Sequence, residues 1–237
     1  MKRAREQLGT GHRTGRGWEC ILLSLLIGCV TFVCEVDKAH AEPSNYRASV
    51  SQSMLFVMVF KDPEALGAKL SHDHVVRARS FDGEIRWDPK DPSACQVSFK
   101  VPVKDLDPDP IALRKRVGLT RMLSRDTRDQ VKAHLLGKDQ LWAEKHPFIT
   151  FSATRCTPKG EKTLVEGQFS LRGQTRSVST LMKIRLTKEG KQLNASGSLA
   201  LKHSWFGFEP YSALGGTLRN KDDLRVVIAI RAAPYAR

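Results

Sequence analysis

The residues best suited to metal chemistry are two histidines, His72 and His74, which flank a single aspartate in the segment LSHDHVVRARSFDGEIRWD. Residues two apart in a β-strand point to the same face, so both imidazoles could reach one metal ion from the same side. A protein metal site needs further ligands, and the later histidines are isolated, with no cysteine or carboxylate at ligand spacing. We therefore predict no metal site and interpret both histidines as polar residues near the start of a strand.

Signatures of catalysis are also absent from the sequence. It contains no Gly-x-Ser-x-Gly elbow, no glycine-rich phosphate loop and no zinc-binding helix motif, and Gly215 and Gly216 are typical of a turn. We predict a protein that is not an enzyme, with no catalytic residues and no cofactor beyond a bound ligand.

The N-terminal segment has the pattern of a secretory signal. Arg13 and Arg16 precede an uncharged apolar run from Ile21 to Cys34, and small residues at Ala39 and Ala41 fit a signal-peptidase site. We predict a signal peptide over residues 1–41 and a periplasmic or secreted protein that begins at Glu42. The alternative is a lipoprotein, because Leu26-Ile27-Gly28-Cys29 resembles a lipobox, although the residues after Cys29 stay apolar.

Most of the net positive charge lies in the part of the chain that follows the predicted signal peptide. The whole chain of 237 residues carries a formal charge of +14. Its first 41 residues contain six basic and four acidic side chains, so the exported part retains +12. Export argues against nucleic acid as the partner of this basic surface and leaves anionic lipid or an envelope polymer.

Two cysteines, Cys95 and Cys156, lie in the exported part, in a compartment that permits disulfides. They begin one predicted strand and end the next. Cys95 has the parity of its apolar neighbours such as Val97, whereas Cys156 has the parity opposite to Phe151. Without a bulge the side chains would lie on opposite faces, so strict alternation favours two unpaired thiols.

Alternation of apolar and polar residues dominates the exported chain and predicts eight strands. They are centred on residues 53–60, 71–87, 94–103, 148–155, 165–172, 178–186, 193–201 and 224–230. Eight such strands with short turns favour a mainly all-β, antiparallel barrel over residues 53–233, after a lead-in at 42–52. The segment 71–87 is long for one strand, and Gly83 is the expected site of a bend.

The segment at about 107–146, between the third and fourth predicted strands, lacks this alternation. Apolar residues there recur at helical spacing, as Val131 and Leu135 do, which predicts a helical insertion. Its basic residues are Arg114, Lys115, Arg116, Arg121, Arg125, Arg128 and Lys132. We interpret them as a solvated helix face balanced by Asp126 and Asp129; the alternative is a basic lid that faces anionic lipid.

The order of these motifs resembles the YceI-like family. The motifs are Phe81-Asp82-Gly83, the segment LWAEKHP at 141–147 followed by FITF, the segment VEGQFSLRGQTR at 165–176, and Trp205-Phe206-Gly207-Phe208. The resemblance covers about residues 53–232. It implies a lipocalin-like eight-stranded antiparallel barrel that holds an isoprenoid chain, in exported bacterial proteins without known catalysis. The segment 104–129 departs from the family pattern by being longer and more charged.

The inner-parity side chains are the candidate ligand-binding residues. They are Phe81, Trp87, Phe99, Val101, Phe151, Phe169, Leu171, Met182 and Phe208. Gly167 and Gly197 share the inner parity and are expected to leave room for a ligand. The resulting hypothesis is a carrier of a long apolar, isoprenoid-like lipid, for transport, storage or sensing. The alternative is a basic surface-binding module for anionic lipid or envelope polymer, with nothing bound inside.

Overall fold

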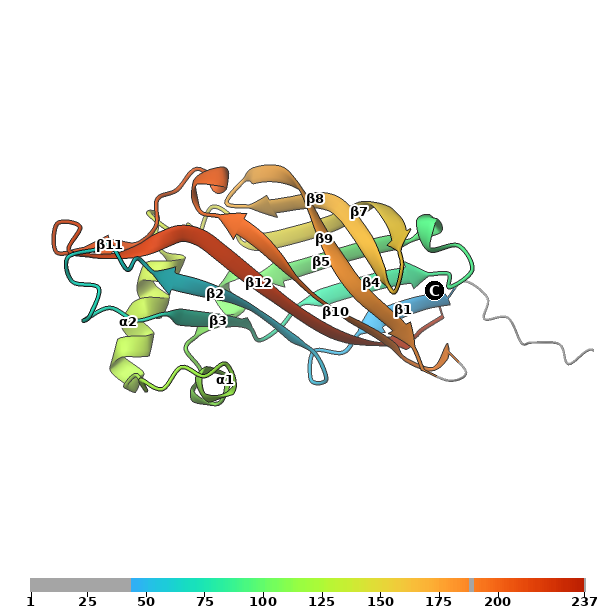
Figure 1. Ribbon diagram of the computed structural model, residues 1–237, viewed down its shortest axis with the longest axis horizontal. Helices are drawn as coiled ribbons and strands as arrows, with labels where there is room; N and C mark the ends of the chain where they lie inside the picture. Colours follow the sequence, from blue (N-terminus) through green and yellow to red (C-terminus); the bar gives the residue numbers. More distant parts are fainter. Residues whose placement is uncertain (1–43, 188–189, 237) are drawn as a thin grey trace, which may run out of the picture. The chain divides into compact units, whose positions relative to one another are not determined.

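The computed structural model describes residues 44–187 and 190–236, which fold into one antiparallel barrel with two short α-helices at one end (Figure 1). The predicted signal segment, with its three cysteines and its cleavage site, lies outside the described residues. The strands are β1 (Ser44–Ala48), β2 (Met54–Lys61), β3 (His74–Ala78), β4 (Asp82–Trp87), β5 (Gln96–Pro102), β6 (Leu106–Pro108), β7 (Phe148–Lys159), β8 (Lys162–Leu171), β9 (Gln174–Leu186), β10 (Leu193–Lys202), β11 (Ser212–Ala213) and β12 (Leu218–Pro234). The α-helices are α1 (Ile111–Arg116) and α2 (Arg125–Leu136), and the 3-10 turns are η1 (Pro92–Ala94), η2 (Val103–Asp105) and η4 (Ser204–Phe206).

The predicted eight-stranded barrel is confirmed. Three of its eight strands are bent, so each of these three is divided into two shorter strands. The pairs β1 and β2, β3 and β4, and β5 and β6 each follow one another along the wall. With β7, β8, β9, β10 and β12 they complete the ring, and every pairing is antiparallel. The long predicted strand bends at residues 79–81 and not at Gly83, which lies within β4 opposite Phe99.

The segment expected only to lead into the barrel supplies the strand that closes it. β1 pairs on one side with β4, where Tyr46 faces Ile85, and on the other with the end of β12, where Tyr46 faces Pro234. Tyr46 is 1% exposed in the main core. Its hydroxyl donates a hydrogen bond of 3.3 Å to the carbonyl of Gly190, so this strand also seals one end of the barrel.

The helical insertion is confirmed and divides into two helices with different roles. Leu113 of α1 packs with Phe56 and Val75 in a small cluster of its own, which is separate from the main core. Leu135 and Leu136 of α2 instead pack against the main core. Within the described residues, no helix is long and apolar enough to cross a bilayer.

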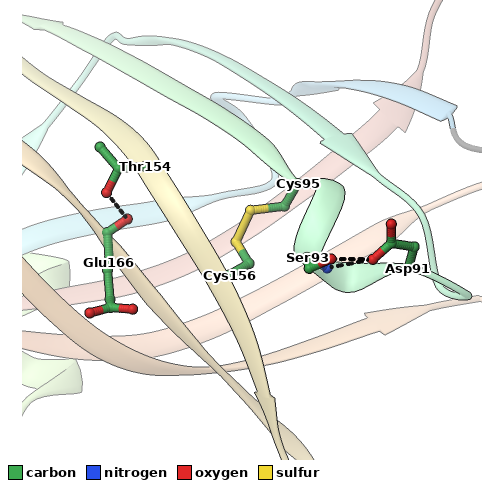
Figure 2. Close-up of a disulfide and its surroundings, with 6 residues drawn as sticks. All are labelled: Asp91, Ser93, Cys95, Thr154, Cys156 and Glu166. Atoms are coloured by element: carbon green, nitrogen blue, oxygen red, sulfur yellow. Dashed lines mark hydrogen bonds between the residues drawn. A yellow bond between two sulfur atoms is a disulfide. The ribbon is translucent and has the colours of Figure 1, made fainter.

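The prediction of two unpaired thiols is wrong, because Cys95 and Cys156 form a disulfide (Figure 2). The register between β7 and β8 shifts between Ala153 and Arg155, which leaves Thr154 as an extra residue. One extra residue turns the rest of the strand over, so Cys156 points inward, where it is 1% exposed. The alternation rule failed here because it assumes an unbroken strand.

Candidate functional site: an apolar lumen with a polar mouth

The barrel interior contains an apolar cavity of about 130 Å³, which we call the inner cavity. Side chains of β2, β4, β5, β7, β8, β9, β10 and β12 line it, and Thr150 and Thr180 are the only polar residues among its described lining residues. The hydroxyl of Thr180 donates to the carbonyl of Ser198 at 2.7 Å. The surface offered to a ligand is therefore almost wholly hydrocarbon, and a cavity of this kind and size stays dry and accepts apolar molecules.

A second apolar cavity, the outer cavity, has a volume of about 140 Å³ and extends toward α2. The two cavities share Leu55, Val101, Ile149, Phe169 and Val226 in their walls, so they adjoin each other. Together they form the lumen, with the ring of Phe169 in the wall of both cavities.

Eight of the nine residues predicted to face the lumen line one or both of these cavities. They are Trp87, Phe99, Val101, Phe151, Phe169, Leu171, Met182 and Phe208. Phe81 lines neither; it is 8% exposed, and its ring centroid lies 6.0 Å from that of Phe99. Aliphatic residues with the same inner parity on these strands complete the wall of the lumen. The alternation that predicted the nine lumen residues predicts an inward position for these aliphatic residues too.

The predicted role of the two inner glycines is corrected. A Cβ on Gly167 would lie 2.6 Å from the ring of Phe151 and 2.5 Å from the carbonyl oxygen of Ser152. The side chain of Met182 occupies the corresponding position beside Gly197. The space that each glycine leaves is therefore filled by a neighbouring side chain of the wall, which can lie flat because no Cβ is present.

The mouth of the lumen is a cavity of about 190 Å³ between α2 and the ends of β2, β3 and β12, and both polar and apolar side chains line it. It shares Val59, Val76, Leu135, Gln140 and His203 with the outer cavity. Within the part of the chain that the structure describes, its polar lining residues are His74, Thr127, Gln130, His134, Gln140, His203, Tyr211 and Asn220. The mouth thus offers polar groups, but none of its described lining residues is an acid, a lysine or an arginine.

His203, between the mouth and the outer cavity, is held as a neutral ring. Its Nδ1 lies 2.9 Å from the carbonyl oxygen of Asp222, which can only accept, so this nitrogen carries the proton. Burial lowers the pKa of His203, which is 5% exposed. The neutral ring then carries its one acceptor nitrogen at Nε2.

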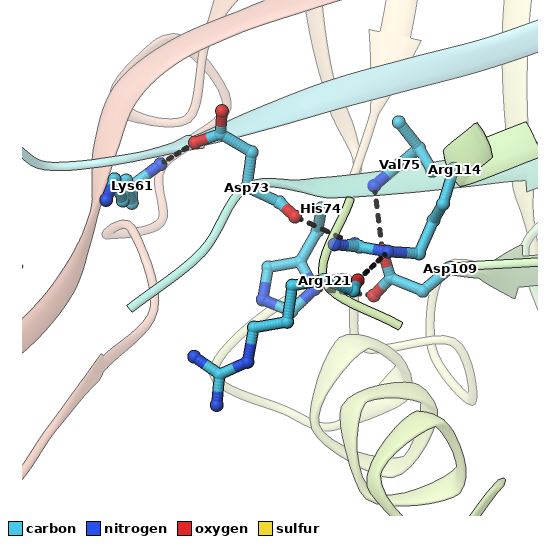
Figure 3. A network of polar contacts seen from close by, with 7 residues as sticks. All are labelled: Lys61, Asp73, His74, Val75, Asp109, Arg114 and Arg121. Atoms are coloured by element: carbon cyan, nitrogen blue, oxygen red, sulfur yellow. Dashed lines mark hydrogen bonds and ion pairs between the residues drawn. The ribbon is translucent and has the colours of Figure 1, made fainter. Parts of the chain in front are cut away.

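A buried ion pair beside the mouth fixes α1 to the wall (Figure 3). Asp109, 0% exposed, accepts 2.5 Å from Arg114 Nη1 and 3.1 Å from the backbone N–H of Val75, and lies 2.6 Å from His74 Nδ1. Burial raises the pKa of Asp109, but the bonds from His74, Val75 and Arg114 outweigh it and hold the pKa below its usual value.

Arg114 corrects the interpretation of the basic insertion as a solvated face. It is 1% exposed and also donates to the carbonyls of Asp73 and Arg121, each at 2.9 Å. Arg125, in contrast, is exposed and lies 3.8 Å from Asp129, as expected for a solvated face. Nothing in the sequence separates the buried arginine from the exposed ones, because its partner Asp109 precedes the helix rather than lying on it.

His72 and His74 lie together, with ring centroids 4.5 Å apart. Burial, followed by the electrostatic effect of the neighbouring His74 and Arg121, lowers the pKa of His72 to about 4, and neither of its buried ring nitrogens has a hydrogen-bond partner. Within the described part of the chain, no three histidine, cysteine, aspartate or glutamate side chains are grouped as metal ligands would be.

A closed eight-stranded antiparallel barrel with an apolar lumen and a polar mouth defines a class of small ligand-binding β-barrels. The chain belongs to the YceI-like family, because the YceI-like domain matches its residues 35–232. This is a family of binding proteins rather than a known enzyme family.

Similar proteins support this assignment. A UPF0312 protein of Photorhabdus laumondii is 29% identical over 132 residues, which are 52% of this chain and 58% of the relative. A UPF0312 protein of Pseudomonas aeruginosa is 27% identical over 139 residues, which are 56% of this chain and 62% of the relative. The matches thus span about three fifths of these relatives' length.

Two solved structures share the fold. BcnA of Burkholderia cenocepacia superposes with a TM-score of 0.59 at 16% identity, over 78% of this chain and 99% of BcnA. The YceI protein of Campylobacter jejuni superposes with a TM-score of 0.50 at 18% identity, over 68% of this chain and 85% of that protein. At these identities the likeness concerns the fold alone.

Proposed function

We propose that this protein holds a long-chain apolar molecule of the isoprenoid type in its lumen, for transport, storage or sensing. The observation that carries the proposal is the adjoining pair of apolar cavities, lined almost entirely by hydrocarbon and continued by a polar mouth. Each methylene buried there contributes roughly 0.8 kcal/mol before ordering costs, so a few isoprene units bind without any polar contact.

The lining of the passage favours a neutral head group. Among the described residues, no lysine, arginine, aspartate or glutamate lines the inner cavity, the outer cavity or the mouth, and the neutral ring of His203 lies between the last two. A phosphate brought into this passage would lose its hydration without gaining a cation, which is costly. An alcohol or a similar neutral polar group fits better, so geranylgeraniol is expected to bind more tightly than geranylgeranyl phosphate.

The test is binding of geranylgeraniol to the purified protein, together with mass spectrometry of an organic extract of protein from its native envelope. Ala195→Phe places a ring in the inner cavity, whereas Ser196→Phe adds the same ring at the exposed next residue of β10. If the ring displaces about one isoprene unit of five carbons, the loss is about 4 kcal/mol, on the order of a thousandfold in affinity. Ser196→Phe should bind as the wild type does.

An empty extract combined with no uptake of geranylgeraniol would refute the carrier function. Equal affinity in Ala195→Phe, with circular dichroism that shows an intact barrel, would place the ligand elsewhere. Binding that disappears at high salt would instead favour the basic surface-binding module, because salt screens surface charge and leaves burial of a chain intact.

Export to the periplasm or the medium is part of the same proposal. The sequence pattern of residues 1–41 supports it, and the Cys95–Cys156 disulfide is typical of oxidising compartments. The intact mass of the protein from the envelope fraction tests this: a chain that begins at Glu42 is expected, and a diacylated Cys29 would establish the lipoprotein alternative.

A further inference from the structure

Three leucines project from two loops that touch each other at the end of the barrel where the mouth lies. Leu66 and Leu70 belong to the loop between β2 and β3 and are 96% and 70% exposed; Leu214, in the turn between β11 and β12, is 73% exposed. We call these three residues the leucine rim. They are the three most exposed of the large apolar side chains in the described residues.

Backbone contacts hold the two loops of the leucine rim together. The N–H of Gly67 donates to the carbonyl of Thr217 at 2.8 Å, and the N–H of Thr217 donates to the carbonyl of Leu214 at 3.2 Å. A Cβ on Gly67 would lie 2.9 Å from that Thr217 oxygen, so glycine permits the close approach. The leucines are therefore presented on a braced pair of loops rather than on independent ones.

The leucine rim lies next to the opening of the lumen. Tyr211 and Asn220, which flank the Leu214 turn, both line the mouth, and the N–H of Asn220 donates to the carbonyl of Tyr211 at 3.0 Å. In Figure 1 the β11–β12 turn and α2 occupy the same end of the barrel. A surface that received the three leucines would therefore lie next to the mouth.

The charged residues beside the leucine rim are of both signs: Asp62 and Glu64 share the loop of Leu66, and Asp62 accepts a hydrogen bond from Arg219 at 2.5 Å. Lys69 precedes Leu70, and Arg121, which is exposed, donates to the carbonyl of Leu70 at 3.0 Å. The segment from Ile111 to Leu136, to which Arg121 belongs, carries seven basic and two acidic residues, of which Arg114 is buried against Asp109. Lysine and arginine beside exposed apolar side chains are the two features with which a protein binds the interface of an anionic bilayer.

We propose that the leucine rim inserts into an anionic lipid bilayer and places the mouth against the membrane, so that an apolar chain passes directly between bilayer and lumen. Leucines that project singly from loop tips suit a fluid bilayer better than a shaped protein groove. The docking itself stands independently of the lumenal ligand, whereas the transfer of a chain rests on the proposed function.

Vesicle flotation tests the docking step. Wild-type protein should float with vesicles of equal parts phosphatidylcholine and phosphatidylglycerol, and less with phosphatidylcholine alone. The double variant Leu66→Ser and Leu214→Ser should bind about tenfold more weakly for each leucine removed, because burial of a leucine is worth at least that factor. Leu181→Ser is the matched control, since Leu181 is 47% exposed on β9, outside both loops, and should behave as wild type.

Transfer is measured as the rate at which geranylgeraniol moves from the same vesicles to the protein, beside its equilibrium affinity when added from ethanol. The double variant should lose rate and keep equilibrium affinity. No equilibrium binding in any variant would refute the carrier function alone and leave flotation as the test of docking. Three outcomes would overturn the leucine rim as a membrane contact. The wild type and the double variant could float equally, or Leu181→Ser could lose as much flotation as the double variant. The wild type could also be a dimer that the double variant converts to a monomer, which would make the leucine rim a contact between copies of the chain.

Discussion

Removal of the Cys95–Cys156 disulfide should destabilise the barrel substantially, and the size of the effect follows from the loop that the bond closes. The two cysteines are 61 residues apart in sequence. In the unfolded chain, a cross-link that closes a loop of this length removes conformational entropy worth about 4 kcal/mol. The double variant Cys95→Ala and Cys156→Ala is preferred to serine variants, because a serine in place of Cys156 would bury a hydroxyl without a hydrogen-bond partner. The loss of free energy of unfolding in the alanine variant should therefore come mainly from the missing cross-link.

Urea unfolding followed by circular dichroism measures this free energy. The double variant should have a free energy of unfolding about 4 kcal/mol below that of the wild type, with a midpoint of thermal unfolding roughly 8 to 16 °C lower. The wild type should approach the variant when a reducing agent is added, and the variant should not respond to it. A variant as stable as the oxidised wild type, or a wild type insensitive to reduction while its two thiols become alkylatable, would refute the reasoning.

Two further predictions concern the polar groups beside the mouth. Asp109→Ala should lower the free energy of unfolding by about 3–5 kcal/mol, because Arg114 is left buried without its carboxylate partner. The double variant Asp109→Leu and Arg114→Met should recover most of this loss. An Asp109→Ala variant whose free energy of unfolding lies within about 1 kcal/mol of the wild type would contradict the prediction. For His72, whose pKa falls from 6.5 to about 4 on folding, the unfolded chain binds the proton more readily, so its contribution to stability is complete above pH 6.5 and is lost as the pH falls toward 4. The full shift would be worth about 3 kcal/mol, and roughly 1–2 kcal/mol remains after allowance for solvent around a half-buried ring. His72→Leu should remove this part of the pH dependence in urea titrations at pH 7 and pH 4, and an unchanged slope would show that another group carries it.

The sequence alone determined the wall of the barrel. A strand exposes its side chains alternately to two faces, so the alternation of apolar and polar residues both marked the eight strands and selected the inner side chains, including Trp87, Phe151 and Met182. The helical insertion was equally readable, because its period differs from that of a strand. These features depend on neighbours within a few residues, which is the range over which sequence periodicity carries information.

Contacts between distant segments decided the rest. The bulge at Thr154 turned Cys156 inward. The alternation of residues in β7 does not predict this bulge, because the extra residue is defined only by the pairing of β7 with β8. Arg114 is one basic residue among seven in its segment, and only the approach of β3 to α1 buries it against Asp109. The room inside the lumen depends on how Phe151 lies across Gly167 on the neighbouring strand, because a cavity is the volume that side chains from many strands leave unfilled, and no single segment of the chain encodes that difference.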